Sequence, residues 1–213
     1  MANELPDGVR AIAHPLIRHK ITQLRATDTK PIVFRAVVRE LARLMMYEAT
    51  RGLAETTRRI ETPLTAMDAP VLEKPYPVLV SIMRAGNAML DGALDVLPMA
   101  GVAHIGIYRD HDTLEAHEYY FNGPPDIAER HNIVVDPMLA TANSSVAALA
   151  RLKTKGVTSL QLVSILAAPE GIAAFSVAHP DVPVLVGAVD EHLDEKGYIV
   201  PGLGDAGDRS FAT

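Results

Sequence analysis

The chain contains no cysteine. This absence excludes disulfide bonds, thiolate metal sites and cysteine nucleophiles. Long apolar runs are also missing: no segment approaches the length of a membrane span, and the opening residues, MANELPDGVRAIAHP, lack the basic region and apolar run of a secretory signal. We therefore expect a cytoplasmic protein without a membrane partner.

Basic residues are fewer than acidic residues in this chain. The 20 Lys and Arg against 26 Asp and Glu give a formal net charge of −6, which argues against a nucleic-acid partner. A glycine-rich P-loop signature is absent, although scattered basic side chains can still form a local phosphate pocket. Hydrophobic residues make up 48% of the 213 residues. This composition and length predict that residues 1–213 fold as a single domain.

Two amphipathic segments lie near the start of the chain. Residues 14–25 carry apolar side chains on one helical face, and residues 34–51 carry a wider apolar stripe that ends before Gly52. Both segments are predicted to be helices. We expect residues 1–60 to form a helical arm or a contact face for a second copy of the chain.

From Pro77 onward, predicted strands and helices alternate. The predicted strands cover residues 77–83, 104–110, 132–136, 159–168 and 182–190. Helical patterns follow most of them, over residues 87–97, from residue 144, and over residues 170–179. This order predicts an α/β fold in which helices flank a mostly parallel, twisted sheet. Residues 111–130 interrupt the alternation and are expected to form a flexible hairpin-like insertion.

The segment from His131 to Gly156 offers a candidate anion site. A short β-branched run ends at Asp136, and a loop rich in Thr and Ser then opens a helix. Free N–H groups at a helix start can surround a phosphate, while a neighbouring carboxylate can accept hydrogen bonds from sugar hydroxyls. Taken alone, the segment is more typical of an ordinary strand-to-helix connection in which Ser144 caps the helix.

Other strand ends carry arginine. Arg84 and Arg109 each follow an apolar strand, and the carboxyl ends of parallel strands meet at one edge of a sheet, where ligands bind. Two guanidinium groups beside an anion loop would suit a ligand with phosphates at both ends. Each arginine alone could also be an ordinary surface residue.

The last segment, residues 197–213, is rich in Gly and Asp and is predicted to be neither helix nor regular strand. Its glycines allow backbone to approach a ligand closely, so exposed amides and carbonyls could pair with a flat heterocycle. The alternative is a turn-rich tail that caps the sheet.

Together these segments match a known family over nearly the whole chain. The sequence resembles the uracil phosphoribosyltransferases of pyrimidine salvage, and the resemblance is carried by HPLIRHKITQLR, FRAVVRELARLMMYEATR, MRAGNAMLDG, HIGIYRD, VVDPMLAT, AAPEGI, AHPDV and YIVPGLGDAGDR. It implies the type I phosphoribosyltransferase fold. The implied reaction converts uracil and 5-phosphoribosyl-1-pyrophosphate (PRPP) into UMP and pyrophosphate, with Mg²⁺ bound through PRPP rather than by a protein metal site.

The resemblance also assigns roles to residues. Arg84, Arg109, Asp136 and Asp205 are the expected catalytic residues. The implied PRPP site comprises Arg84, Arg109, Asp136, Pro137, Met138, Leu139, Ala140, Thr141, Ala142, Asn143, Ser144 and Asp205. The implied uracil site comprises Ile199, Gly204, Asp205 and Ala206, within a base-binding loop at residues 197–213. A homodimer or larger homo-oligomer is expected, and GTP is a candidate effector.

The sequence departs from the family pattern at three places. Ala142 and Asn143 stand where glycine is usual after Thr141, and a positive φ at Ala142 would cost about 1 kcal/mol. Asn87 and Ala88 replace a common Leu and Gly, and residues 121–123 lack a lysine that is often present. These changes keep open an alternative function, a catalytically weakened homologue that senses UMP or uracil.

Overall fold

A mixed, mostly parallel sheet organises the protein, which is described here from a computed structural model covering residues 5–109 and 116–213. The strand order is β1-β10-β9-β7-β4-β5-β6, and β8 pairs with β9. All neighbours on this path are parallel except β5 and β6, which are antiparallel. The strands are β1 Val9–Ala11, β4 Val78–Met83, β5 Gly101–Arg109, β6 Ala116–Asn122, β7 Asn132–Val135, β8 Met138–Leu139, β9 Leu160–Ala167 and β10 Val184–Val189. The predicted α/β class is confirmed.

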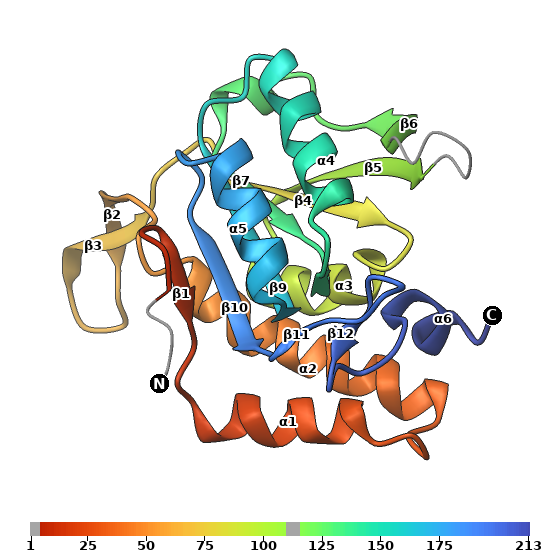
Figure 1. The fold of residues 1–213 in the computed structure, drawn as a ribbon. Helices are drawn as coiled ribbons and strands as arrows, with labels where there is room; N and C mark the ends of the chain where they lie inside the picture. The colour runs from red at the N-terminus through yellow and green to blue at the C-terminus, as the bar shows by residue number, and fades with distance from the viewer. Residues whose placement is uncertain (1–4, 110–115) are drawn as a thin grey trace.

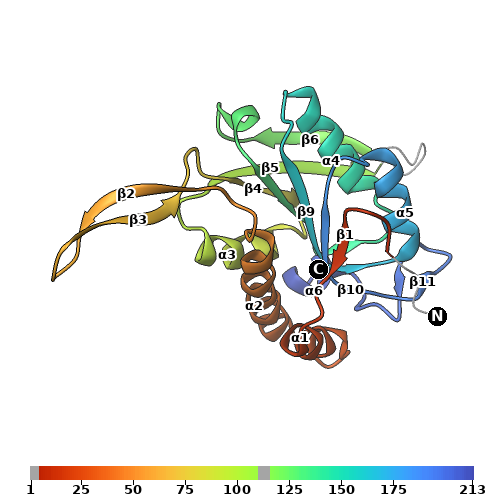
Figure 2. The ribbon, with the colours of Figure 1, turned by 90° about the vertical axis from the view of Figure 1, so that its left-hand side faces the viewer.

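Helices cover both faces of the sheet because successive strand residues point to opposite sides. Leu79, Ile133 and Val163 pack in one apolar cluster, whereas Val80, Val134 and Leu162 pack in a second. The first cluster includes buried side chains of α1, α2 and α3, and the second includes those of α4 and α5. These two groups of helices lie on opposite faces of the sheet (Figure 1, Figure 2). The helices are α1 Pro15–Arg25, α2 Pro31–Ala49, α3 Asn87–Val96, α4 Asn143–Thr154 and α5 Pro169–Ala178.

The amino-terminal region differs from the expected helical arm. The side chains of Phe34, Leu41 and Met45 on α2 are fully buried in the first apolar cluster, so α1 and α2 form a layer on the sheet. Residues 9–11 also add an edge strand parallel to β10. The apolar stripe of α2 suggested a contact face for a second copy of the chain. In the structure, this stripe packs against the chain's own sheet.

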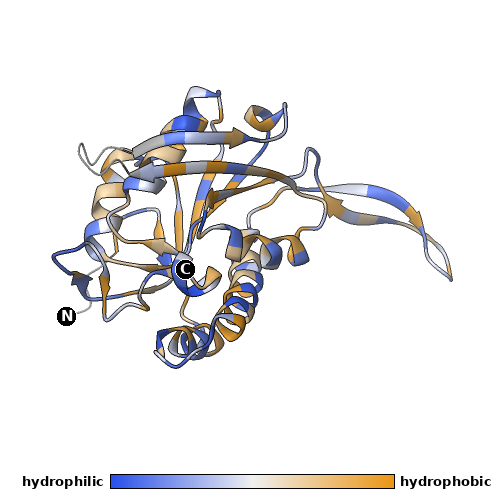
Figure 3. Cartoon of the chain, turned by 90° about the vertical axis from the view of Figure 1, so that its right-hand side faces the viewer, coloured by the Kyte–Doolittle hydropathy of each residue, from blue (hydrophilic) through white to orange (hydrophobic). Residues whose placement is uncertain are grey.

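A β-hairpin, formed by β2 Glu55–Glu61 and β3 Ala66–Leu72, was not predicted from the sequence. It projects away from the sheet (Figure 2), and the predicted helical region 1–60 ended inside β2. Most of its side chains are exposed. Figure 3 shows both hydrophilic and hydrophobic stretches along it. Since neither face is buried by this chain, the hairpin lacks the alternation that identifies a half-buried strand.

Two other segments also refine the expectations. Within the expected insertion at 111–130, β6 joins the sheet as an antiparallel neighbour of β5, while residues 111–115 lie outside the described part. The carboxyl-terminal segment contains a short strand, β12 Ile199–Val200, paired with β11 His192–Leu193, and a helix, α6 Ala206–Phe211. The prediction of no regular structure there was wrong, because Asp205 caps a six-residue helix despite the high glycine content.

Membrane-spanning helices are absent from residues 5–109 and 116–213: none there combines the necessary length and apolar composition.

Candidate functional site

The site is organised by a change of direction in the sheet between β4 and β7. From β4 the chain passes through α3 to β5 on one side, whereas from β7 it passes through α4 to β9 on the other. In open α/β sheets, ligands bind beyond the carboxyl ends of the strands at such a point. Arg84 follows β4 directly and Asp136 follows β7 directly. The topology therefore brings these two predicted residues to one place.

Of the two predicted arginines, the structure describes Arg84 with its side chain and Arg109 by its backbone alone. The exposed Arg84 guanidinium lies 3.3 Å from a carboxylate oxygen of Asp208 on α6. Arg109 ends β5, the parallel neighbour of β4, so its backbone lies at the same edge of the sheet. Its side chain is outside the described part of the structure. Arg84 therefore connects the end of β4 with the carboxyl-terminal segment.

Asp136 is the buried acid of the site. The residue is 8% exposed, and the Ser145 hydroxyl donates a hydrogen bond of 3.2 Å to its carboxylate. Burial raises the pKa of Asp136 to about 6, because the desolvated carboxylate loses more than its hydrogen bonds restore. It is consequently a carboxylate above this pH and a carboxylic acid below it.

The loop from Asp136 to Ser145, here called the phosphate loop after the role that the resemblance implies, contains a strained residue. Ala142 has φ 65° and ψ −2°, the left-handed conformation, and α4 begins at the next residue. The backbone N–H groups of the first turn therefore lack acceptors within the helix. The positive φ considered from the sequence for this position is therefore present. The Ala142 methyl is 5% exposed and packs in the second apolar cluster, which offsets part of the strain.

Other predicted loop residues face the interior. Pro137 is buried and Leu139 is fully buried, while their carbonyls accept hydrogen bonds from the backbone of β9 and the residue after it. A Cβ on Gly171 would lie 2.1 Å from the Ala140 carbonyl oxygen, so α5 can approach the loop only with glycine there. Asn143 and Ser144 are exposed and Thr141 is half-buried. These three are polar side chains of the loop that remain accessible to a ligand.

A cavity of about 150 Å³ lies between the phosphate loop and the segment from Gly197 to Ala206, here called the base segment after the role that the resemblance implies. All four residues expected at the uracil site line this cavity. Its lining is Met138, Ala140, Gly197, Tyr198, Ile199, Gly204, Asp205 and Ala206. Tyr198, which was not singled out from the sequence, lies beside the predicted Ile199, and its aromatic ring was the available signal. Met138 and Ala140 were expected in the PRPP site. In the structure, these two residues of the phosphate loop also line the cavity beside the base segment.

Asp205 serves as the N-cap of α6. Its Oδ1 atom accepts a hydrogen bond of 2.8 Å from the backbone N–H of Asp208. Within the described ranges, no three His, Cys, Asp or Glu side chains gather as they would to hold a metal ion. These residues offer individual carboxylates at the site rather than a metal cage.

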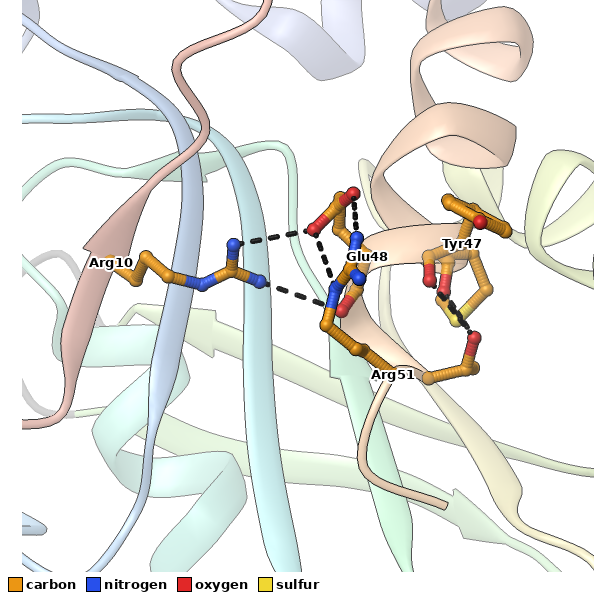
Figure 4. Close-up of polar contacts among 6 residues, drawn as sticks. Arg10, Tyr47, Glu48 and Arg51 are labelled. Carbon is orange, nitrogen blue, oxygen red and sulfur yellow. Dashed lines mark hydrogen bonds and ion pairs between the residues drawn. The ribbon is translucent and has the colours of Figure 1, made fainter.

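A larger cavity, of about 720 Å³, lies at the opposite edge of the sheet. Its lining includes His131 and Ser159, which precede β7 and β9. Two of its cations, Arg10 and Arg51, share one carboxylate, that of Glu48, at 3.3 and 2.8 Å (Figure 4). These contacts lower the pKa of Glu48 and connect β1 to the end of α2. None of the predicted site residues lines this cavity.

Comparison with known proteins identifies the family. The family model described as uracil phosphoribosyltransferase matches residues 11–213. This chain belongs to the uracil phosphoribosyltransferase family. Two uracil phosphoribosyltransferases, from Brucella ovis and Rhizobium meliloti, are 57% and 56% identical to it, each over 97% of this chain and 99% of the relative. The resemblance inferred from the sequence is thereby confirmed.

A solved structure shares the fold of this chain. The AQ2163 protein from Aquifex aeolicus superposes with a TM-score of 0.91 at 36% identity, covering 96% of this chain and 98% of that one. The match therefore extends over nearly the full length of both chains. The family assignment therefore agrees with the architecture.

Proposed function

We propose that this protein transfers the 5-phosphoribosyl group from PRPP to uracil, giving UMP and pyrophosphate. One observation carries the proposal: the base cavity shares a wall, Met138 and Ala140, with the loop that leads to the helix start. A pyrimidine in this cavity would lie next to a ribose held by the phosphate loop. Family membership supports the same substrates.

The residues provide orientation and electrostatics rather than a nucleophile. As the bond from C1 of the ribose to pyrophosphate breaks, the sugar gains positive character, the leaving group gains negative charge, and a ring nitrogen of uracil forms the new bond and loses its proton. Arg84, and Arg109 by resemblance, stabilise the leaving charge. Asp136 accepts hydrogen bonds from the ribose hydroxyls, and the N–H groups at the start of α4 bind the 5-phosphate.

Mg²⁺ is proposed to arrive with PRPP. Asp136 and Asp205 each offer a carboxylate at the site, and no three His, Cys, Asp or Glu side chains of the described residues gather to hold the ion by themselves. When bound to the pyrophosphate, the ion would neutralise charge on the leaving group. The protein's own contribution is to hold Asp205 in place through the cap of α6.

A homo-oligomer is part of the proposal, and the hairpin supports it. Leu64 at its tip is 94% exposed and Met67 is 41% exposed. An isolated two-stranded hairpin is barely stable in water, so a second copy of the chain would provide the missing apolar contact. Light scattering during size-exclusion chromatography measures this. GTP is carried forward from the family resemblance as a candidate effector, and adding GTP to the activity assay tests it.

The decisive experiment measures UMP formed from radiolabelled uracil, PRPP and Mg²⁺ with purified protein. We expect UMP and pyrophosphate in equal amounts, and no product when PRPP is left out. UMP binding without turnover would overturn the proposal and identify the protein as the UMP or uracil sensor considered as the alternative function.

A further inference from the structure

The base segment is held by a charge pair from elsewhere in the chain. The Arg25 guanidinium, at the end of α1, donates to both carboxylate oxygens of Asp190, at 2.7 and 2.5 Å. The same guanidinium donates to the carbonyl of Gly202 at 2.7 Å. Asp190 in turn accepts from the backbone N–H of Gly202 at 2.8 Å. Both backbone polar groups of Gly202, its N–H and its carbonyl, are therefore held by hydrogen bonds.

The residue held by these hydrogen bonds, Gly202, lies between two residues that line the base cavity. Ile199 and Gly204 line the cavity, and Gly202 stands between them in a left-handed turn with φ +62°. A Cβ on Gly202 would lie 1.9 Å from the Ile199 carbonyl oxygen, so the turn is tightly closed. A shift of Gly202 would move the walls on both of its sides.

The Arg25–Asp190 pair fixes the position of Gly202 and does not itself contact the base cavity. The Asp190 side chain is 4% exposed and that of Arg25 is 27% exposed, and neither lines the base cavity. Planar guanidinium binds a carboxylate through two parallel hydrogen bonds, which fixes both distance and angle. Arg25 uses a third direction for the Gly202 carbonyl, which a lysine ammonium on a flexible stem cannot reproduce in the same geometry.

We propose that Arg25 is a positioning residue for the base: through Asp190 and Gly202 it sets the width of the uracil cavity, and it thereby determines affinity for the base but not for the sugar phosphate. The inference rests on the proposed function for the identity of the base. It adds that a helix outside the site, α1, takes part in base recognition.

The test compares Arg25→Ala and Arg25→Lys with the wild type, and uses Arg18→Ala as the control. Arg18 is exposed on the same helix, so its removal subtracts the same charge without touching the base segment. Loss of hydrogen bonds to a charged donor should raise the KM for uracil about tenfold in Arg25→Ala, with the KM for PRPP unchanged. Arg25→Lys keeps a cation beside buried Asp190, so it should remain folded and recover part of the affinity.

The outcomes separate positioning from simple stabilisation. A change confined to Tm or kcat, or an equal rise in both KM values, would overturn the inference. Calorimetry with UMP and with ribose 5-phosphate gives a readout that needs no turnover: Arg25→Ala should weaken UMP binding alone. If the wild type forms no UMP from uracil and PRPP, the proposed function fails, and this calorimetric comparison still decides the role of Arg25.

Discussion

The phosphate loop and the base segment line one cavity, but different interactions hold them in place. Backbone pairing of β8 with β9 and the packing of α5 hold the phosphate loop against the sheet. The base segment lies beyond the last strand of the sheet, and guanidinium groups of Arg25 and Arg209 hold it. The comparison shows that one half of the site is specified by neighbouring residues, whereas the other depends on contacts between distant parts of the chain.

The largest expected effect comes from breaking the phosphate side at Asp136. Asp136→Asn keeps the shape but replaces the charged acceptor for the ribose hydroxyls, so kcat/KM for PRPP should fall about a hundredfold. Initial rates at pH 8 measure this. Asp181→Asn is the control, since Asp181 is an exposed acid paired with Lys153. Unchanged kinetics in Asp136→Asn would remove Asp136 from the site.

The titration of Asp136 gives a second, slightly smaller effect. Its pKa is raised from 3.8 to about 6, so the folded state favours the protonated form. The stability from this group is therefore fully present below pH 3.8 and is lost as the pH rises through 6, by about 3 kcal/mol in total. Activity should move the opposite way and fall about tenfold per pH unit below 6, because the carboxylate is the acceptor.

Denaturant unfolding and kcat/KM, each measured from pH 4 to pH 8, test this titration. Asp136→Asn should lose the part of both profiles that the carboxyl group contributes. If the variant keeps the wild-type profiles, another group titrates in this range.

Removing the Arg209 side chain, which holds the base segment, should lower the free energy of unfolding more than it lowers activity. Its guanidinium donates to the carbonyls of Leu24, Ala26 and Leu203, and it lies 4.6 Å from the Phe34 ring centroid. Arg209→Ala leaves these partners without their donor, so the free energy of unfolding should fall by about 2 kcal/mol. Urea unfolding measures the loss, with Arg18→Ala as the control. A fall below 0.5 kcal/mol would show that the base segment does not depend on this side chain.

The same contrast explains which features were predictable from sequence. Val134 and Asp136 belong to a strand and loop whose pattern is local, so the strand, the acid and the following helix were predicted. The Arg25–Asp190 pair joins residues 165 positions apart, and no spacing rule brings them together. The β2–β3 hairpin was missed for another reason: its exposed faces carry no apolar alternation. Ile199 and Gly204, which line the base cavity, were predicted only through the family resemblance, since their surroundings depend on long-range contacts.

The smallest expected effect compares two adjacent positions of the phosphate loop. Ala142 and Asn143 both stand where the family pattern has glycine, but their backbone conformations differ. Ala142 is the left-handed residue, whereas Asn143 is the first residue of α4. Ala142→Gly removes the strain and loses one buried methyl, so it should stabilise the protein by about 0.5 kcal/mol and lower the KM for PRPP a few-fold.

Asn143→Gly is the matched control, because glycine gains nothing at a helical position and costs a few tenths of a kcal/mol there. Thermal unfolding and PRPP titrations of the two variants and of the double variant separate the positions. Equal gains from both substitutions would mean that general loop flexibility limits PRPP binding. A gain from Ala142→Gly alone would locate the difference from other family members in the φ angle of one residue.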